Sequence, residues 1–375
     1  MTLMSTEVLP DARALRLGRR ERALAQMAAH DLDVLVLGRQ ANVRYVTGAP
    51  QLWVAGTRPF GPTCVLVRET GAVHLLSTWD EGIPEDIPRE NLYGISWNPA
   101  NTIAALSRIA GASTARRVGT DALSPVFAQL LPTAFPSAEL VDGELAMRAA
   151  RRIKTDEEIV ALRDSIAVAE SGQAAAVAGL RPGVREQELA GVLLEAVAAG
   201  GVSTPSNQDV AWVTSREHPW RRAAGDGRVQ SGDLVALSAG VLAGGYIGEV
   251  GRTWPVGDVT GAAELFGRWD RLWDMLIAVC QPGAGAGELL AAYAAAGEPA
   301  PPMPVARGLG MGFDPPVISA RMPRTAAQER LEPGMVLAVT GYVWEQGVGA
   351  VFGREAVLIT ADGPQMLTAS PFWRG

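Results

Sequence analysis

An internal repeat constrains the fold of this chain more than any other feature of its sequence. A Pro-Gly turn followed by a helical pattern at residues 181–189 returns at 281–289, 100 positions later. A turn and a short apolar run at 232–240 return at 334–341, 102 positions later. Two echoes at nearly equal offsets indicate a duplicated unit of helices, turn, strand and hairpin. We therefore expect an α+β domain with a pseudo-twofold axis and a central cleft where the duplicated strands face one another.

A different pattern precedes the repeat. Helical spacing at 17–29 is followed by a short, β-rich apolar run at 32–37, which is typical of an α/β domain. Thr155 is a candidate N-cap, because acidic residues follow it directly and a long helical pattern extends to about residue 179. A chain of 375 residues can form two packed cores. We predict an α/β domain over 1–150 and the duplicated α+β domain over 151–375.

Charge and hydropathy exclude several function classes. The chain has 33 Lys and Arg against 40 Asp and Glu, a net charge of −7, so it lacks the broad positive charge of a nucleic-acid-binding protein. No run approaches about 18 consecutive apolar residues, and residues 1–20 hold no signal-peptide core. We therefore expect a cytoplasmic protein that binds neither nucleic acid nor membrane.

The few cysteines and histidines limit what the chain can do with metals. Cys64 and Cys280 suit neither a disulfide framework nor a paired-cysteine zinc site, and we expect two buried, reduced thiols. Three histidines are present. His30 lies at a predicted helix–strand turn and His74 in an alternating strand pattern, so we expect both to be structural. This leaves His218 as a candidate for chemistry.

The duplicated segments carry motifs that resemble a known superfamily. These motifs are residues 230–240, Gly245-Tyr246, Arg252-Thr253, 308–316 and 331–336. They are similar to motifs of the superfamily that contains methionine aminopeptidases, aminopeptidase P, prolidases and creatinase, and the resemblance spans nearly the whole chain. It implies a creatinase-like α/β N-terminal domain and a pita-bread C-terminal domain, the duplicated α+β fold of these proteins. It also implies a homodimer.

In the peptidases of this superfamily, two Asp, one His and two Glu hold two metal ions. The resemblance places five residues at those positions, with Glu355 replacing the last if the alignment shifts by one: Ser238, Glu249, Arg307, Thr340 and Arg354. Arginine is always protonated and has no lone pair for a metal, and two guanidinium groups repel a dication. We therefore predict that neither a catalytic metal nor another cofactor binds, and that the chain is not a functional metallo-aminopeptidase or prolidase.

Creatinase, an amidinohydrolase, is the precedent in this superfamily for catalysis without a metal. In that branch a Glu precedes the Arg-Thr pair, as Glu249 does here, and a His upstream of the Gln-Ser-Gly-Asp turn carries the proton, as His218 would. The resemblance thus implies that His218 is the general acid and base and that Glu249 orients or activates the nucleophile. Arg307 and Thr340 depart from creatinase, so recognition of a guanidino group is not supported.

Arg307 and Arg354 suit an anion, because guanidinium groups form bidentate hydrogen bonds with carboxylates. The first hypothesis is a metal-independent hydrolase that acts on a C–N bond of a small carboxylate-bearing molecule. Further candidates for contact with that substrate are Ser238, Thr340 and Glu355. The alternative is an inert ion network in which Arg354 pairs with Glu249, and Arg307 with Glu355 or Asp314.

Two other functions stay open: a non-catalytic binding or scaffold protein, and an isomerase or lyase that uses the same His and Glu.

In this superfamily an N-terminal loop of the dimer partner often closes the cleft. The corresponding loop here holds three candidate residues, Trp53, Arg58 and Phe60. Three tryptophans fall near the predicted cleft walls, where packing is the simpler expectation: Trp212, Trp220 and Trp344.

Overall fold

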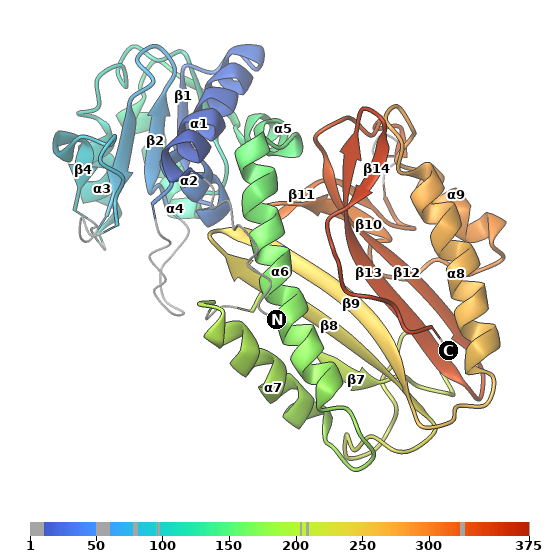
Figure 1. The fold of residues 1–375 in the computed structure, drawn as a ribbon. Helices are drawn as coiled ribbons and strands as arrows, with labels where there is room; N and C mark the ends of the chain where they lie inside the picture. Colours follow the sequence, from blue (N-terminus) through green and yellow to red (C-terminus); the bar gives the residue numbers. More distant parts are fainter. Residues whose placement is uncertain are drawn as a thin grey trace. The chain divides into compact units, whose positions relative to one another are not determined.

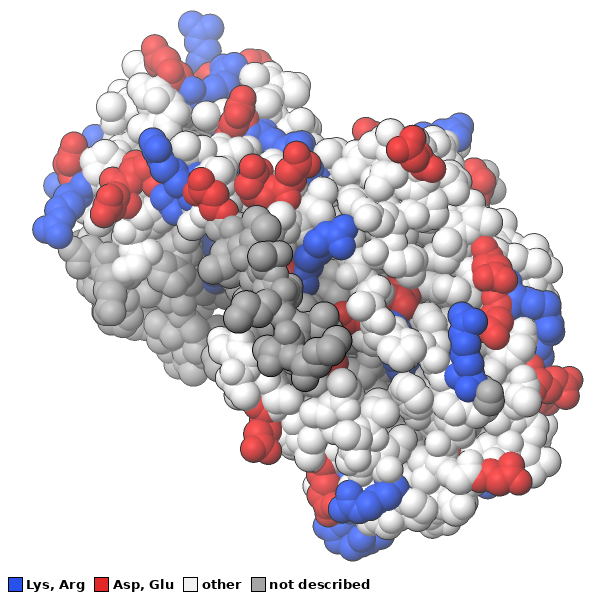
Figure 2. Space-filling view, viewed as in Figure 1, with Lys and Arg blue, Asp and Glu red and all other residues white. Residues whose placement is uncertain are grey.

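The computed structural model describes residues 11–49, 61–77, 82–94, 96, 98–202, 205–207, 210–322 and 327–374. The chain divides into two compact units, Asp11–Arg151 and Arg152–Gly375 (Figure 1). No helix among the described residues is long and apolar enough to cross a membrane. On the face drawn in Figure 2, acidic and basic side chains of the described residues are intermixed over both units.

The first unit is built on a mixed sheet. Its described strands have the order β4-β3-β2-β1-β5-β6, and the pairs β1/β5, β5/β6 and β3/β4 are parallel. All four residues of β1 are buried, as expected for a strand near the middle of a sheet that is covered on both faces. The α/β expectation for this part is confirmed. The elements are α1 (Ala12–Ala29), β1 (Val34–Leu37), α2 (Gln40–Thr47), β2 (Cys64–Val67), β3 (Val73–Leu76), η1 (Arg89–Asn91), β4 (Leu92–Tyr93), α3 (Pro99–Leu106), β5 (Arg117–Thr120), α4 (Pro125–Ala134), β6 (Glu139–Asp142) and α5 (Glu144–Arg152).

The cysteines and two of the histidines have structural surroundings. Cys64 and Cys280 are buried free thiols, as predicted, and burial raises the pKa of both. The Nδ1 atom of His30 lies 2.9 Å from the carbonyl oxygen of Gln26. The Nδ1 atom of His74 lies 3.1 Å from the hydroxyl of Tyr93, and burial lowers the pKa of His74.

The second unit contains one large, mostly antiparallel sheet. Among the described residues its strands have the order β11-β10-β12-β13-β9-β8-β7, with β14 paired to β13. The elements are α6 (Asp156–Ala178), α7 (Glu186–Ala199), β7 (Ala211–Val213), β8 (Asp233–Ala243), β9 (Tyr246–Val256), α8 (Ala262–Val279), α9 (Glu288–Ala295), β10 (Ala306–Leu309), β11 (Phe313–Ile318), β12 (Val336–Glu345), β13 (Gly349–Thr360) and β14 (Gly363–Met366).

The internal repeat is visible in this topology. Two helices, a short strand and a long hairpin occur twice, first as α6, α7, β7, β8 and β9 and then as α8, α9, β10, β12 and β13. The two copies meet in the middle of the sheet, where Arg354 on β13 pairs with Gly251 on β9. The predicted pseudo-twofold α+β domain is therefore confirmed.

Helices cover one face of this sheet (Figure 1). Helices α6 and α7 pack on apolar residues of β8 and β9, and α8 and α9 pack on those of β10, β12 and β13. Thr155 caps α6 as predicted, since its side chain accepts from the backbone of Glu158 while Glu158 accepts from the backbone of Thr155. The helices leave the other face of the sheet available for a site.

Candidate functional site

Polar side chains gather on the face of the second sheet that the helices do not cover, which we call the inner face. Successive side chains of a strand point to opposite faces, and Leu237, Val250 and Val339 lie in the helix-covered cores. The residues that alternate with them therefore lie on the inner face. The strand registers bring six of these together: Ser238 on β8, Glu249 on β9, Arg307 on β10, Thr340 on β12, and Phe352 and Arg354 on β13.

Glu249 joins the two arginines of this face. One of its oxygens accepts a hydrogen bond from Nη2 of Arg307, and the other accepts from Nη1 of Arg354 at 3.3 Å. Only 3% of Glu249 is exposed. Because both carboxylate oxygens bind guanidinium groups, Glu249 holds the two arginines in place. The pairing of Arg354 with Glu249, one of the two arrangements left open by the sequence, is therefore present.

Arg307 lies deep in this cluster. Burial lowers the pKa of its guanidinium group, Glu249 raises it, and the positive charge of Arg354 lowers it further. Arginine nonetheless stays protonated in proteins, so a permanent positive charge is buried here. A second ion pair, in which Nζ of Lys154 lies 3.0 Å from Oδ2 of Asp314, is almost fully buried.

Arg354 is the more accessible of the two arginines. Its side chain is 17% exposed, its Nε donates to the hydroxyl of Thr340 at 3.0 Å, and its Cζ lies 5.4 Å from the centre of the Phe352 ring. In the part of the chain that the structure describes, its Nη2 donates no hydrogen bond. A Cβ on the facing Gly251 would lie 2.4 Å from Phe352 and 3.0 Å from Arg354, so a glycine is needed there.

Ser238 and Thr340 occupy symmetric places on β8 and β12. The hydroxyl of Ser238 accepts a hydrogen bond from Nδ2 of Asn207 at 2.9 Å. The hydroxyl of Thr340 accepts from Arg354, as described above, and Thr340 is 1% exposed. Thr340 thus orients Arg354, whereas Ser238 is tied to the segment that precedes β7.

Glu355 does not join the cluster. The sequence predicted it either as a partner of Arg307 or, after a shift of one residue, in the position of Arg354, and the structure corrects both expectations. It follows Arg354 in the same strand, so its side chain points to the opposite, helix-covered face. There its Oε1 accepts from Nη2 of Arg252 at 2.7 Å. Arg307 pairs instead with Glu249, because the strand register places these two side chains on the same face.

The donors of the inner face do not fit a divalent metal ion. Arg307 and Arg354 carry positive charge and offer no lone pair, and both oxygens of Glu249 already bind them. The oxygen atoms of Ser238 and Thr340 accept hydrogen bonds from protein donors. Among the residues that the structure describes, no three His, Cys, Asp or Glu side chains come together as a group that could hold a metal.

His218 lies in an exposed loop that is fixed to the same sheet. Its backbone nitrogen donates to the hydroxyl of Ser215 at 3.2 Å. On either side of His218, the carbonyl of Ser215 accepts from Nε1 of Trp344 at 2.8 Å, and the backbone nitrogen of Trp220 donates to the hydroxyl of Tyr342 at 2.9 Å. Two residues of β12 thus anchor the His218 loop to the inner face.

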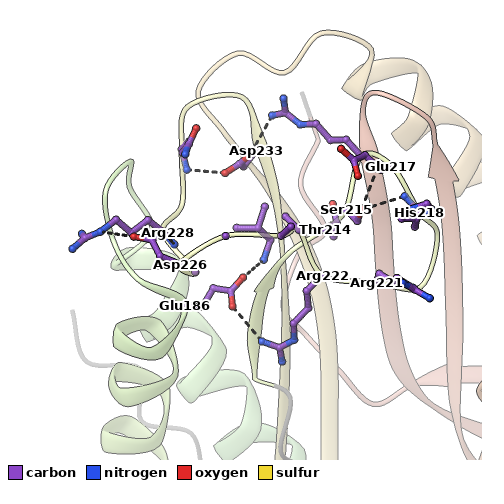
Figure 3. A pocket seen from close by; sticks show the side chains of 17 residues that line it. Glu186, Thr214, Ser215, Glu217, His218, Arg221, Arg222, Asp226, Arg228 and Asp233 are labelled. Atoms are coloured by element: carbon purple, nitrogen blue, oxygen red, sulfur yellow. Dashed lines mark hydrogen bonds and ion pairs between the residues drawn. The ribbon is translucent and has the colours of Figure 1, made fainter.

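His218 also lines a pocket of about 390 Å³ (Figure 3). Two ion pairs join residues that line this pocket, Arg222 with Glu186 at 3.2 Å and Arg228 with Asp226 at 3.2 Å. In the view of Figure 3, His218 lies at one end of the pocket and Arg228 at the other. The residues that line it do not include Glu249, Arg307 or Arg354, so His218 and the ion cluster do not share this pocket.

The sequence did not indicate the role of two aromatic residues. Tyr342 and Phe352 form a facing pair on β12 and β13 and separate the His218 loop from Arg354. Their spacing of two from Thr340 and Arg354 is the signal that could have placed them on the inner face. Three predicted site residues lie outside the described residues: Trp53, Arg58 and Phe60.

Comparisons with known proteins identify the family. The model described as "Metallopeptidase family M24" matches residues 160–361, and the one described as "Creatinase/Prolidase N-terminal domain" matches residues 19–153. The chain belongs to metallopeptidase family M24. The predicted superfamily and its two-domain pita-bread architecture are confirmed, while metal independence stays a prediction.

Relatives in the M24 family cover nearly the whole chain. The uncharacterized hydrolase/peptidase y4tL of Sinorhizobium fredii is 26% identical over 97% of each chain. The creatinase of a Bacillus species is 25% identical over 94% of this chain and 90% of that protein. The crystal structure of the prolidase from Pyrococcus horikoshii superposes with a TM-score of 0.77 at 19% identity, covering 94% of this chain and 99% of that one.

Proposed function

We propose that this M24 protein is a metal-independent hydrolase that cleaves a C–N bond in a small molecule bearing a carboxylate. The observation that carries the proposal is that Arg354 is held in place by its neighbours but still has a donor nitrogen available. Its guanidinium group is fixed by Thr340 and Glu249, is partly exposed on the inner face, and keeps Nη2 available as a donor. The relatives support hydrolysis, since they include a creatinase and a hydrolase/peptidase.

The arginine cluster would bind the carboxylate of the substrate. Arg307 and Arg354 share the single carboxylate of Glu249, so one anion accepts from two cations. A carboxylate that accepts a hydrogen bond from Nη2 of Arg354 would add a second anion to a cluster that holds two cations. Thr340 and Glu249 prevent the guanidinium group from rotating, which lowers the entropy lost on binding. In this proposal Glu249 is a positioning residue, and it does not act as the base.

His218 would move the proton. An imidazole can take a proton from the attacking water and then give it to the departing nitrogen. The oxygen of water forms the new bond to carbon, the C–N bond breaks, and the proton ends on the amine that leaves. Trp344 and Tyr342 bind the backbone on either side of His218, which anchors the loop that carries the imidazole to the inner-face strands.

The test is hydrolysis by protein from which metals have been removed with a chelator. A panel of carboxylate-bearing amides, lactams and cyclic amidines is incubated with it, and amine release is measured. We expect release at the same rate with and without chelator. His218→Asn should lower the rate by about 100-fold or more, the usual contribution of a general acid and base. His30→Asn is the matched control, because the His30 ring hydrogen-bonds to Gln26 of its own helix and lies in the first unit.

Three results would contradict this proposal. Activity that appears only with added manganese, cobalt or zinc would show that the site works with a metal. Equal rates in His218→Asn and His30→Asn would remove His218 from the chemistry. Binding of the panel without release of amine would favour the second candidate, a non-catalytic binding protein. The closed contacts of Glu249 with both arginines favour that candidate, since they resemble an inert ion network.

A further inference from the structure

Five aromatic side chains lie together beside Arg354. Tyr342 and Phe352 form the buried part of this cluster, and three partly buried tryptophans pack against it. We call the five residues the aromatic floor: Trp212, Trp220, Tyr342, Trp344 and Phe352. Strand alternation places Tyr342, Trp344 and Phe352 on the inner face, and Trp212 is on the same face because it pairs with Ala236.

The floor is continuous with the anion-binding end of the face. The ring centre of Phe352 lies 5.5 Å from that of Trp212 and 5.4 Å from Cζ of Arg354. Tyr342 faces Phe352 across the β12–β13 ladder and packs against Trp220, with the two ring centres 4.0 Å apart and the rings tilted by 33°. A molecule bound to Arg354 would therefore lie next to the buried Phe352 ring and could extend toward the partly buried tryptophans.

The backbone of Trp220 provides a second, independent observation. Its φ angle is 66°, in the left-handed region that bulky residues rarely adopt. Such a conformation persists only where the surrounding structure holds the residue, and residues of this kind cluster at active and binding sites. Here the tilted ring contact with Tyr342 and the hydrogen bond from the Trp220 backbone to the Tyr342 hydroxyl hold it.

We infer that the substrate is an acid with an aromatic or similarly flat apolar group, in which Arg354 binds the carboxylate and the aromatic floor binds the ring. This inference rests on the proposed function for the identity of the anion site. Stacked or edge-to-face contacts with several rings favour an aromatic group over an aliphatic one, because such contacts add to the effect of apolar burial. The inner face would then select acids by the group attached to them.

Binding of three ligands that have no C–N bond tests this inference without turnover. 4-Phenylbutanoate carries both groups, butanoate lacks the ring, and 4-phenylbutan-1-ol lacks the charge. Calorimetric titration at neutral pH should give tighter binding of 4-phenylbutanoate than of either other ligand, by about tenfold or more. Trp220→Gly should remove most of the difference between 4-phenylbutanoate and butanoate. Glycine adopts a φ of 66° without strain, so this variant should fold.

A matched pair of variants separates the floor from general packing. Trp212→Leu removes a partly buried ring from the inner face, and Trp254→Leu makes the same change in the core on the opposite face of the sheet. We expect only the first to weaken binding of 4-phenylbutanoate by about fivefold or more, with butanoate unchanged.

Equal affinity for 4-phenylbutanoate and butanoate, with both lost in Arg354→Gln, would overturn the aromatic floor but leave the anion site. Affinity for 4-phenylbutan-1-ol equal to that for 4-phenylbutanoate would overturn the anion site and with it the proposed function.

Discussion

Glu355 and Arg252 lie on the helix-covered face of β13 and β9, with side chains 4% and 1% exposed. Burial raises the pKa of Glu355 to about 7, from an ordinary value of 4.5, although the positive charge of Arg252 opposes the rise. Arg252 also donates to the backbone oxygens of Ser370 and Pro371 and lies 4.0 Å from the Phe372 ring. The pair therefore holds the C-terminal segment against the sheet.

This pair predicts a pH dependence of stability. Because the pKa of Glu355 is raised in the folded state, its favourable contribution is present below about pH 4.5 and is lost as the pH rises toward 7. Glu355→Gln keeps the shape and removes the titration. Urea unfolding between pH 4.5 and 7.5 should show that the wild type loses more free energy of unfolding than the variant, by roughly 1–3 kcal/mol. Glu264→Gln, on an exposed position of α8, is the control, and parallel curves for wild type and Glu355→Gln would contradict this assignment.

At the scale of elements, helix α6 packs directly on strand β9. A Cβ on Gly248 would lie 2.2 Å from the carbonyl oxygen of Ser165 and 2.6 Å from the nitrogen of Ile166. These are backbone atoms of a long helix, so they cannot move aside as a side chain could. The absence of a side chain at Gly248 thus sets the distance between α6 and the strand that carries Glu249.

Gly248→Ala should consequently destabilise the second unit. Overpacking against a helix backbone is expected to cost about 3 kcal/mol, measured by chemical denaturation. Gly191→Ala is the matched control, because Gly191 lies inside α7 with nothing within 4 Å of an added Cβ. That substitution should stabilise the protein by about 0.5–1 kcal/mol through helix propensity. Similar effects of the two substitutions would mean that α6 can shift away from β9.

At the scale of the whole molecule, each unit has its own hydrophobic core. Among the described residues, one core lies within Asp11–Arg151, and two helix-covered cores lie within Arg152–Gly375, one on each half of the large sheet. The ion cluster, the aromatic floor and the His218 loop all belong to the second unit. The site that we propose for an aromatic acid is therefore contained in that unit.

Residues 152–375 expressed alone should therefore fold. Thermal denaturation followed by circular dichroism should give a cooperative transition, because the fragment retains both of its cores. The fragment should also bind 4-phenylbutanoate within about tenfold of the full chain. The corresponding fragment with Trp220→Gly provides the comparison for specific binding. A fragment without a cooperative transition would show that the second unit depends on the first.

The duplicated fold and the N-cap at Thr155 could be predicted from the sequence, because repeats and caps are encoded by neighbouring residues. The two arginines were placed in the candidate site by the resemblance to the superfamily. How the charged side chains of the second sheet pair could be seen only in the tertiary structure. Arg354 and Glu355 are adjacent in sequence, and a shift of one residue in strand register would exchange their faces. Register depends on the packing of whole strands. It therefore decides that Arg354 pairs with Glu249 and that Glu355 pairs with Arg252. The same long-range packing joined Trp220 to Tyr342 across 122 residues of chain and created the aromatic floor.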